Sequence, residues 1–422
     1  MDIVSYATPF FLLAIVLELG WGFFRKKNTY RLNDSVNSLS LGMLSTLAKL
    51  AFISVGALVF AKVESEWALF SFDQSSAVHW VVALLFYDLC YYWFHRISHE
   101  RQIFWGSHVV HHQSEDYNLS TALRQTSTGI FATWIFYVPC FLLGIPLYMF
   151  VTIASGHLVY QFWIHTQHIP KLGFLEWFLI TPSNHRVHHA QNAQYVDKNY
   201  GGLLIIWDRL FGTFAEEDED EKVIYGLRTP LQSWNPLWAN MHIFFGMVND
   251  AIKTQNVRDK VAILWSRTGW RPADVAEKYP VQKTNLDDFH KYNPQLATAS
   301  TVAVVLHYLL LLVYFLWFMA HVADMSYIAR CANMVILTFS AVTIGSIIDQ
   351  HSKMMLVEFV RLTVIGAIII TAYITSDTPV SWLYYGLFYS LITSVLTVIS
   401  IRQTNHFISD DMSTWETESN SN

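Results

Sequence analysis

The sequence predicts an all-α, polytopic integral membrane protein: a bundle of membrane helices with a cytosolic, histidine-rich cap that holds two metal ions. Its composition supports the membrane class, because 53% of the 422 residues are hydrophobic, 16% are aromatic and only 14% are charged. Apolar stretches of about twenty residues, long enough to cross a bilayer as helices, recur along the chain. Three clusters of histidines predict the metal site.

The N-terminal region, residues 1–76, contains two predicted membrane helices, over 3–24 and 39–61. The first apolar stretch lacks the preceding basic residues of a cleavable signal peptide, so it is predicted to be retained as an anchor. Basic residues follow this helix and include Arg25 and Lys26. The positive-inside tendency therefore places this end of the helix in the cytosol and the N-terminus on the opposite side.

The central region, residues 77–297, is the predicted catalytic region. A helix over 77–94 should cross in the same direction as the first helix, which places His95 at the cytosolic face. The apolar stretch 129–165 is interrupted by two prolines and a glycine, which fits a helical hairpin that returns the chain to the cytosolic side. The mixed segment 172–297 is predicted to form a cytosolic cap whose tryptophans either rest on lipid headgroups or pack in the core.

The C-terminal region, residues 298–422, is predicted to add four membrane helices and a polar tail. The predicted helices cover residues 299–320, 331–348, 355–373 and 382–401, and the tail covers 409–422. Ionisable residues in this region lack metal-ligand spacing and are predicted to make interfacial or helix–helix contacts. They are His307, His321, Asp349, His351 and Glu358.

Charge and cysteine content exclude two classes of partner or site. The net charge of −6 and the acidic run 216–221 leave no basic surface of the kind that binds nucleic acid. The three cysteines, Cys90, Cys140 and Cys331, lie in apolar segments without paired spacing. They are predicted to be packing residues, not disulfides or metal ligands.

Histidines are concentrated between residues 95 and 189, which contain eleven of the eighteen in the chain. Two histidines four residues apart on a helix lie on one face and can bind one ion. Eight histidines in three motifs are predicted ligands, and His165 is a better ninth candidate than His168. The predicted metal ligands are His95, His99, His108, His111, His112, His165, His185, His188 and His189. Nine imidazoles are too many for one ion and suffice for two.

Neighbouring polar residues have two open interpretations each. Asp88 lies on the helical stripe of His95, where it would either accept the second ring proton of a ligand, or cap or bridge helices. The segment 114–125 begins with a helix-capping pattern, with Ser114 as the candidate cap. Four residues in this segment are also candidates for a pocket that binds the substrate headgroup or a cofactor: Glu115, Asp116, Asn118 and Arg124.

The donor set alone does not choose the metal, because imidazole suits zinc, copper, iron and nickel alike. The membrane setting points to lipid oxidation, and inserting oxygen into an aliphatic C–H bond requires activated dioxygen. Iron is therefore predicted.

The histidine motifs at the ends of membrane helices resemble the fatty acid hydroxylase and sterol desaturase superfamily of non-haem di-iron membrane enzymes. The runs 108–125, 160–166, 185–189, 197–200 and 206–214 are most similar to the superfamily members that hydroxylate the ether-linked carbon of alkylglycerols. This resemblance implies two iron ions and tetrahydrobiopterin as cofactors, dioxygen and a membrane alkylglycerol as substrates, and a fatty aldehyde and a glycerol derivative as products. It implies residence in the endoplasmic reticulum membrane of a eukaryote or the cytoplasmic membrane of a bacterium.

The resemblance also implies a catalytic role for Glu100, which directly follows His99. The alternative for this residue is a surface ion pair with Arg96 or Arg101.

Other functions remain alternatives. A sterol or fatty acyl hydroxylase or desaturase of the same superfamily, with another electron donor, would need the same metal site. A histidine-rich metal transporter or storage protein is less favoured, because the predicted ligands gather at one membrane face and do not form a path across it. Haem bound by two histidines would use paired ligands on facing helices, not adjacent histidines at helix ends. Sequence does not predict the oligomeric state.

Overall fold

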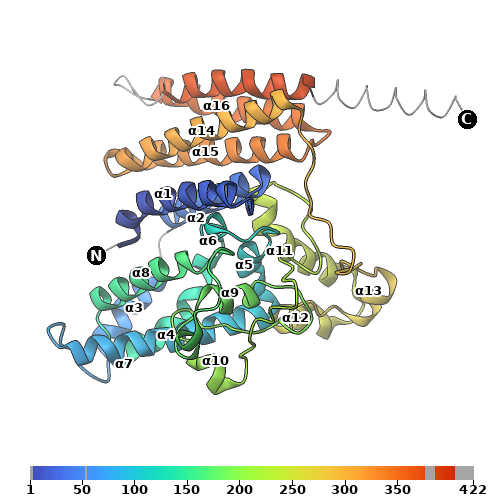
Figure 1. Ribbon diagram of the computed structural model, residues 1–422. Coiled ribbons are helices and arrows are strands. Elements are labelled where there is room, and N and C mark those ends of the chain that lie inside the picture. Colours follow the sequence, from blue (N-terminus) through green and yellow to red (C-terminus); the bar gives the residue numbers. More distant parts are fainter. Residues whose placement is uncertain (1–2, 53–54, 376–384, 404–422) are drawn as a thin grey trace, which may run out of the picture. The chain divides into compact units, whose positions relative to one another are not determined.

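A computed structural model describes residues 3–52, 55–375 and 385–403 (Figure 1). Within these ranges the chain is helical, and its extended pairing is limited to two isolated β-bridges, Leu179 with Leu204 and Ala190 with Tyr225. Six of the described helices are long and apolar enough to cross a membrane, and one bent pair would make a seventh. The predicted all-α, multi-pass membrane architecture is thus confirmed.

The chain divides into two compact units. The first comprises Met1–Leu231 and Asn240–Lys291, and the second comprises Gln232–Ala239 and Tyr292–Asn422. The division into regions 1–76, 77–297 and 298–422 stays a prediction.

The first unit begins with α1 (Ile3–Phe24), α2 (Leu32–Ala51) and α3 (Val55–Trp67). The single helix predicted over 39–61 is wrong, because α2 and α3 are separate helices bent by 57°. Helix α2 also starts earlier than predicted and buries polar residues in its first turns, including Asp34 and Asn37. Helix α1 packs against α8, where the rings of Phe11 and Phe162 stack with centroids 4.1 Å apart.

The apolar stretch predicted as a hairpin folds into short turns and one long helix. Its elements are η1 (Gly129–Phe131), η2 (Thr133–Tyr137), α7 (Val138–Leu143) and α8 (Leu147–Trp163). The chain reverses at Gly144, whose φ of 101° is left-handed and where a Cβ atom would lie 1.9 Å from the carbonyl oxygen of Phe70. Only glycine fits this turn. The hairpin packs on α3 and α4 around a core that includes the stacked rings of Phe60 and Phe141.

Helix α4 (Ala77–Glu100) is the central element of the first unit. Its N-terminus is capped by Ser76, whose side chain accepts from the backbone N–H of His79. At Arg101 the backbone is extended, so α4 ends there and α5 (Gln102–His112) begins at an angle to it.

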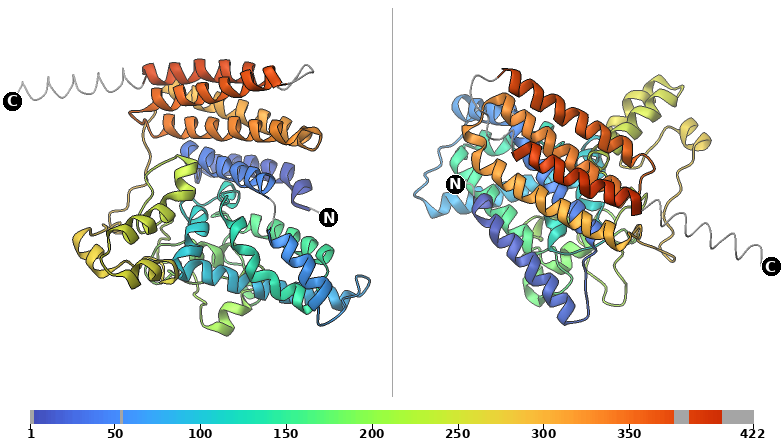
Figure 2. Two further views of the ribbon diagram at one scale, coloured as in Figure 1. Left: turned by 180° about the vertical axis from the view of Figure 1, so that it is seen from behind. Right: turned by 90° about the horizontal axis from the view of Figure 1, so that it is seen from above.

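The rest of this unit is loops, short helices and one longer helix, α11 (Pro236–Lys253), whose residues from Asn240 onwards belong to this unit (Figure 2). The short helices are α6 (Leu119–Ala122), η3 (Gly173–Trp177), α9 (Pro182–His188), α10 (Ile206–Phe211), α12 (Val257–Trp265) and α13 (Ala273–Lys278).

The described part of the second unit contains four long helices. They are α14 (Thr298–His321), which leads into η4 (Val322–Asp324), then α15 (Tyr327–Ile348), α16 (Met354–Thr375) and a last helix over Tyr385–Gln403. A buried ion pair joins Arg361 to Glu358 at 2.7 Å, and the guanidinium also donates to Thr393 on the last helix. Glu358 therefore pairs within α16, and Arg361 makes the polar contact between α16 and the last helix.

Candidate metal centre

Nine histidines converge in the first unit as two adjacent groups. In each group, one ring nitrogen from every residue lies within 4.8 Å of all the others. Group A contains His95, His99, His108, His112 and His188. Group B contains His111, His165, His185 and His189. These are the nine residues predicted as ligands, and His168 belongs to neither group.

Three helices and one loop bring these rings together. Helix α4 supplies its last two histidines to group A, and α5 and α9 each supply histidines to both groups. Adjacent residues on a helix point about 100° apart, so His111 and His112 diverge into different groups, as do His188 and His189. Helix α9 is held in place at its start by Thr181, whose hydroxyl caps the N–H of Asn184, and by Pro182 in its first turn.

The spacing of ring nitrogens within each group fits a metal ion. Imidazole nitrogens bind divalent ions at about 2.0–2.1 Å, so two ligands at right angles would lie about 3.0 Å apart. The Nε2 to Nε2 distances are 3.0 Å for His95–His108, 3.1 Å for His108–His112, 3.1 Å for His111–His165, 3.0 Å for His165–His185 and 3.2 Å for His185–His189. The buried Nε2 atoms of His99 and His188 have no protein partner. The residues therefore fit two histidine-bound metal ions.

Backbone carbonyls fix the ring orientation of four of these histidines. In each case Nδ1–H donates to a carbonyl oxygen, which leaves the lone pair on Nε2 free for a metal. The acceptors are Tyr200 for His95 (2.7 Å), Lys198 for His188 (2.9 Å), Arg124 for His111 (3.1 Å) and Gln161 for His165 (2.7 Å).

Burial keeps the rings in the neutral form that binds metals. It lowers the pKa of His111 to about 4 and that of His188 to about 3. The pKa of His185 is also far below the ordinary value, first because of burial and then because of the neighbouring His165. At neutral pH these imidazoles carry no charge, so they need not lose a proton to bind an ion.

Asp208 shapes the loop that presents two of the carbonyl acceptors. Its carboxylate accepts from the backbone N–H groups of Tyr200 and Gly201, at 2.7 and 2.8 Å, and from the hydroxyl of Thr213 at 2.7 Å. Burial raises its pKa to about 6 against these donors. Residues 206–214 thus hold the loop that orients His95 and His188. In the sequence this run was marked only by its resemblance to the superfamily.

Asp88 bridges helices and does not contact a candidate ligand, which decides between its two predicted interpretations. It accepts from His157 Nε2 at 2.6 Å and from Trp207 Nε1 at 2.9 Å. It also accepts from the backbone N–H groups of Leu203 and Leu204. No spacing signal in the sequence marks His157. In the structure its Nδ1 accepts from the side chain of Gln161 at 2.6 Å, and the carbonyl oxygen of Gln161 in turn accepts from His165 of group B.

The segment 114–125 forms a tight turn followed by α6. The helix cap is Asn118, not Ser114, because the Asn118 side chain accepts from Ser120 N–H and its backbone N–H donates to Thr121. Asp116 pairs with Arg31 at 2.8 Å and with Lys291 at 2.5 Å. Arg124 is fully buried and donates to the carbonyl oxygen of Val110.

Glu100 lies at the end of α4, outside both histidine groups. Its carboxylate pairs with Arg96 at 2.8 Å, and about a quarter of its side chain is exposed. Its backbone carbonyl accepts from the N–H of Thr268. The ion pair with Arg96 is the alternative that sequence analysis named, and the catalytic role of Glu100 stays a prediction.

Comparison with known proteins agrees with this geometry. The fatty acid hydroxylase family model matches residues 80–213, which contain all nine histidines. The central third of the chain is also similar to an ornithine lipid hydroxylase of Rhizobium tropici, at 30% identity over 32% of this chain and 41% of that protein. No solved structure matches the chain.

More extensive similarity is found to a narrower set of enzymes. Alkylglycerol monooxygenase of Homo sapiens is 38% identical over 85% of this chain and 81% of the human protein. The enzyme of the same name from Danio rerio is 37% identical over 86% of this chain and 81% of the fish protein. That of Caenorhabditis elegans is 31% identical over 79% of this chain and 70% of the nematode protein. The superfamily resemblance seen in the sequence is confirmed, and the chain belongs to the alkylglycerol monooxygenase family of oxidoreductases.

Proposed function

We propose that this chain hydroxylates the ether-linked carbon of alkylglycerols, using two iron ions, dioxygen and tetrahydrobiopterin. The observation that supports this most strongly is the pair of adjacent histidine groups, in a membrane protein of this family. Group A would hold one ion and group B the other. The substrate and the pterin are proposed from the relatives and from the resemblance of the sequence motifs.

The reaction balances with one dioxygen and one pterin. One oxygen atom enters the C–H bond next to the ether oxygen, and the other leaves as water with two electrons and two protons from tetrahydrobiopterin. The resulting hemiacetal breaks its C–O bond to give a fatty aldehyde and a glycerol derivative. Bound iron would supply the activation of dioxygen that C–H oxidation needs.

The chain's own residues hold the site ready for this chemistry. Burial keeps the candidate ligands uncharged, and backbone carbonyls orient their rings. The fixed positions mean that binding an ion requires little rearrangement. Glu100 is the proposed acidic catalytic residue, and His99, the candidate ligand beside it, is buried. We further propose the endoplasmic reticulum membrane as location in a eukaryote, or the cytoplasmic membrane in a bacterium.

The test is aldehyde release from an alkylglycerol by iron-loaded membranes that contain this chain, with tetrahydrobiopterin present or omitted. Aldehyde that appears only with the pterin supports both the substrate and the cofactor. Two bound irons per chain without aldehyde would contradict the substrate. A sterol or fatty acyl substrate with another electron donor would then be the alternative, favoured by the shared hydroxylase region at 80–213.

A further inference from the structure

Helices α11 and α12 expose apolar side chains in a pattern that a water-facing surface would not carry. On α11, the exposed residues Met241, Phe245, Val248 and Ile252 follow each other at intervals of four, three and four, so they form one stripe. Ile252 is 73% exposed. On α12, the exposed apolar residues are Val257, Val261, Leu264 and Trp265. Exposed apolar stripes of this length mark a membrane or partner contact.

The opposite face of α11 is buried and partly polar. Met247 and Asp250 lie there, and Asp250 forms a bidentate ion pair with Arg271, with hydrogen bonds of 2.6 and 2.8 Å. Phe244 packs on Gly106 of α5, where a Cβ atom would come within 2.9 Å of the ring. The polar side of the helix is therefore committed to the protein interior, and its apolar side faces outward.

The occupant that fits this face is the bilayer surface. Helix α11 is not among the six helices apolar enough to cross a membrane, so it would lie along the bilayer and not across it. Three cations flank the turn between the two helices: Lys253 is the last residue of α11, and Arg258 and Lys260 lie near the start of α12. Such cations suit anionic lipid headgroups. Trp265 ends the apolar face of α12, and tryptophan is typical of the boundary between lipid and water.

The same segment is bonded to the junction of α4 and α5. After α12, the carbonyl oxygen of Ser266 accepts from Gln102 N–H at 3.1 Å. Thr268 donates from its N–H to the carbonyl oxygen of Glu100 at 3.3 Å and from its hydroxyl to the carbonyl oxygen of His99. A bilayer contact of α11 and α12 would therefore be mechanically linked to the backbone that carries a group A histidine.

We propose that α11 and α12 form a hairpin that lies in the plane of the membrane interface, with the exposed apolar residues in lipid, and that it anchors the α4–α5 junction at the membrane surface. This inference goes beyond the proposed function, because it does not depend on which lipid the enzyme oxidises. An interfacial helix of this kind buries its apolar face about 5–10 Å into the headgroup and acyl boundary.

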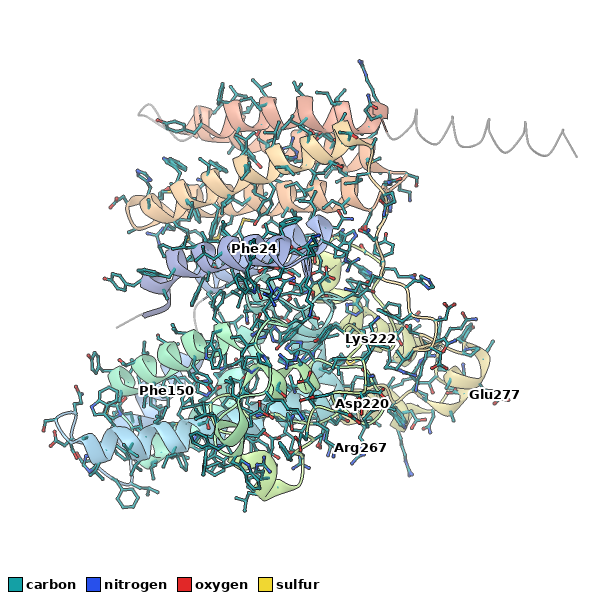
Figure 3. The ribbon with its side chains drawn as sticks, in the orientation of Figure 1. Phe24, Phe150, Asp220, Lys222, Arg267 and Glu277 are labelled. Carbon is teal, nitrogen blue, oxygen red and sulfur yellow. The ribbon has the colours of Figure 1, made fainter. Side chains whose placement is uncertain are left out.

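The experiment uses the full chain in nanodiscs of phosphatidylcholine and phosphatidylserine. Ile252→Cys and Val261→Cys are made in a Cys331→Ser background, since Cys90 and Cys140 are buried. Each cysteine is labelled with an environment-sensitive fluorophore. The matched control is Glu277→Cys on α13, an exposed polar position whose side chain projects at the periphery of this unit (Figure 3). Retention of bound iron shows that each labelled variant is folded.

The expected result is blue-shifted emission at positions 252 and 261, with strong quenching by lipids brominated near the glycerol end. The label at position 277 should show neither effect. Labels at 252 and 261 that are no more quenched than the control would overturn the proposal. A second result would also overturn the proposal: labels that are shielded from water but insensitive to brominated lipid, and whose emission changes with the number of chains per disc. That result would indicate a second copy of the chain as the occupant.

Discussion

The ring of His111 is hydrogen-bonded to the backbone of Arg124, with Nδ1 lying 3.1 Å from the carbonyl oxygen. The side chain of Arg124 also binds the end of α5, because its Nε donates to the carbonyl oxygen of Val110 at 2.8 Å. Its guanidinium lies 3.9 Å from the carboxylate of Asp34 on α2. Asp34, in turn, accepts from Ser114 at 2.6 Å. A buried charge pair that begins in the N-terminal helices thus supports a group B histidine.

Asp34→Asn is expected to weaken metal binding without unfolding the protein. The substitution removes the charge opposite Arg124, so the end of α5 is held less firmly, and loss of such supporting contacts lowers metal affinity by about 10- to 100-fold. The measurement is the rate of iron loss to a chelator. Asp73→Asn, at an exposed loop position, is the control. Equal iron retention in both variants would show that Asp34 does not support the site.

His188→Ala is expected to weaken binding of the group A ion, since four of that group's five histidines remain, and to spare that of group B. Under dialysis against a chelator, iron content should fall from about two per chain towards one, and turnover should fall by at least about 100-fold, because a lost ligand costs more than a lost supporting contact. Iron analysis and aldehyde release measure the two effects. His290→Ala is the control, since that side chain is exposed at the surface. Substantial turnover by the His188 variant would contradict the two-ion assignment.

The candidate ligands were predictable because their signal is local. Histidines spaced three or four residues apart share a helix face, so sequence alone indicates that they converge. The distribution into two groups was not predictable, because it depends on the angle between α5 and α9. The contribution of Asp34 was also hidden. A hydropathy pattern places such a residue in water, whereas packing of α2 on α6 buries it. For the same reason the predicted helix 39–61 began too late, because the polar first turns of α2 are buried and helical.

Asp88 and His157 are expected to stabilise the protein cooperatively. Asp88→Asn replaces a carboxylate that accepts from four donors, and each hydrogen bond to a charged group contributes about 1.5–3 kcal/mol. The thermal midpoint of the variant in detergent should therefore fall clearly. The thermal midpoint should also fall in His157→Gln. In the double variant the midpoint should fall by less than the sum of the two single decreases, because the residues are in contact. Additive losses would show that the pair does not act as a unit.

Acidification is expected to destabilise the metal-free protein. The unfolded chain binds a proton on each histidine near the ordinary pKa of about 6.5, whereas His111 and His188 remain neutral in the folded protein until about pH 4 and 3. Between those limits the unfolded state binds more protons, so stability falls as the pH falls, by about 1.4 kcal/mol per pH unit for each histidine. Unfolding followed from pH 7 to pH 5 measures this slope. His188→Gln should reduce the slope, and an unchanged slope would contradict the burial of a neutral ring.

Glu100→Gln is expected to retain iron and lose turnover. Glu100 belongs to neither histidine group, so its charge is not needed to bind an ion, whereas the resemblance of the sequence assigns it to the reaction. The ion pair with Arg96 provides the matched comparison, because Arg96→Gln breaks the same contact at 2.8 Å and leaves the carboxylate in place. If Glu100 acts in catalysis, the Arg96 variant should keep most of its turnover while the Glu100 variant loses about 100-fold, the range of general acid–base effects. Equal losses in the two variants would instead make the ion pair structural, and a parallel loss of iron in Glu100→Gln would make Glu100 part of the metal site.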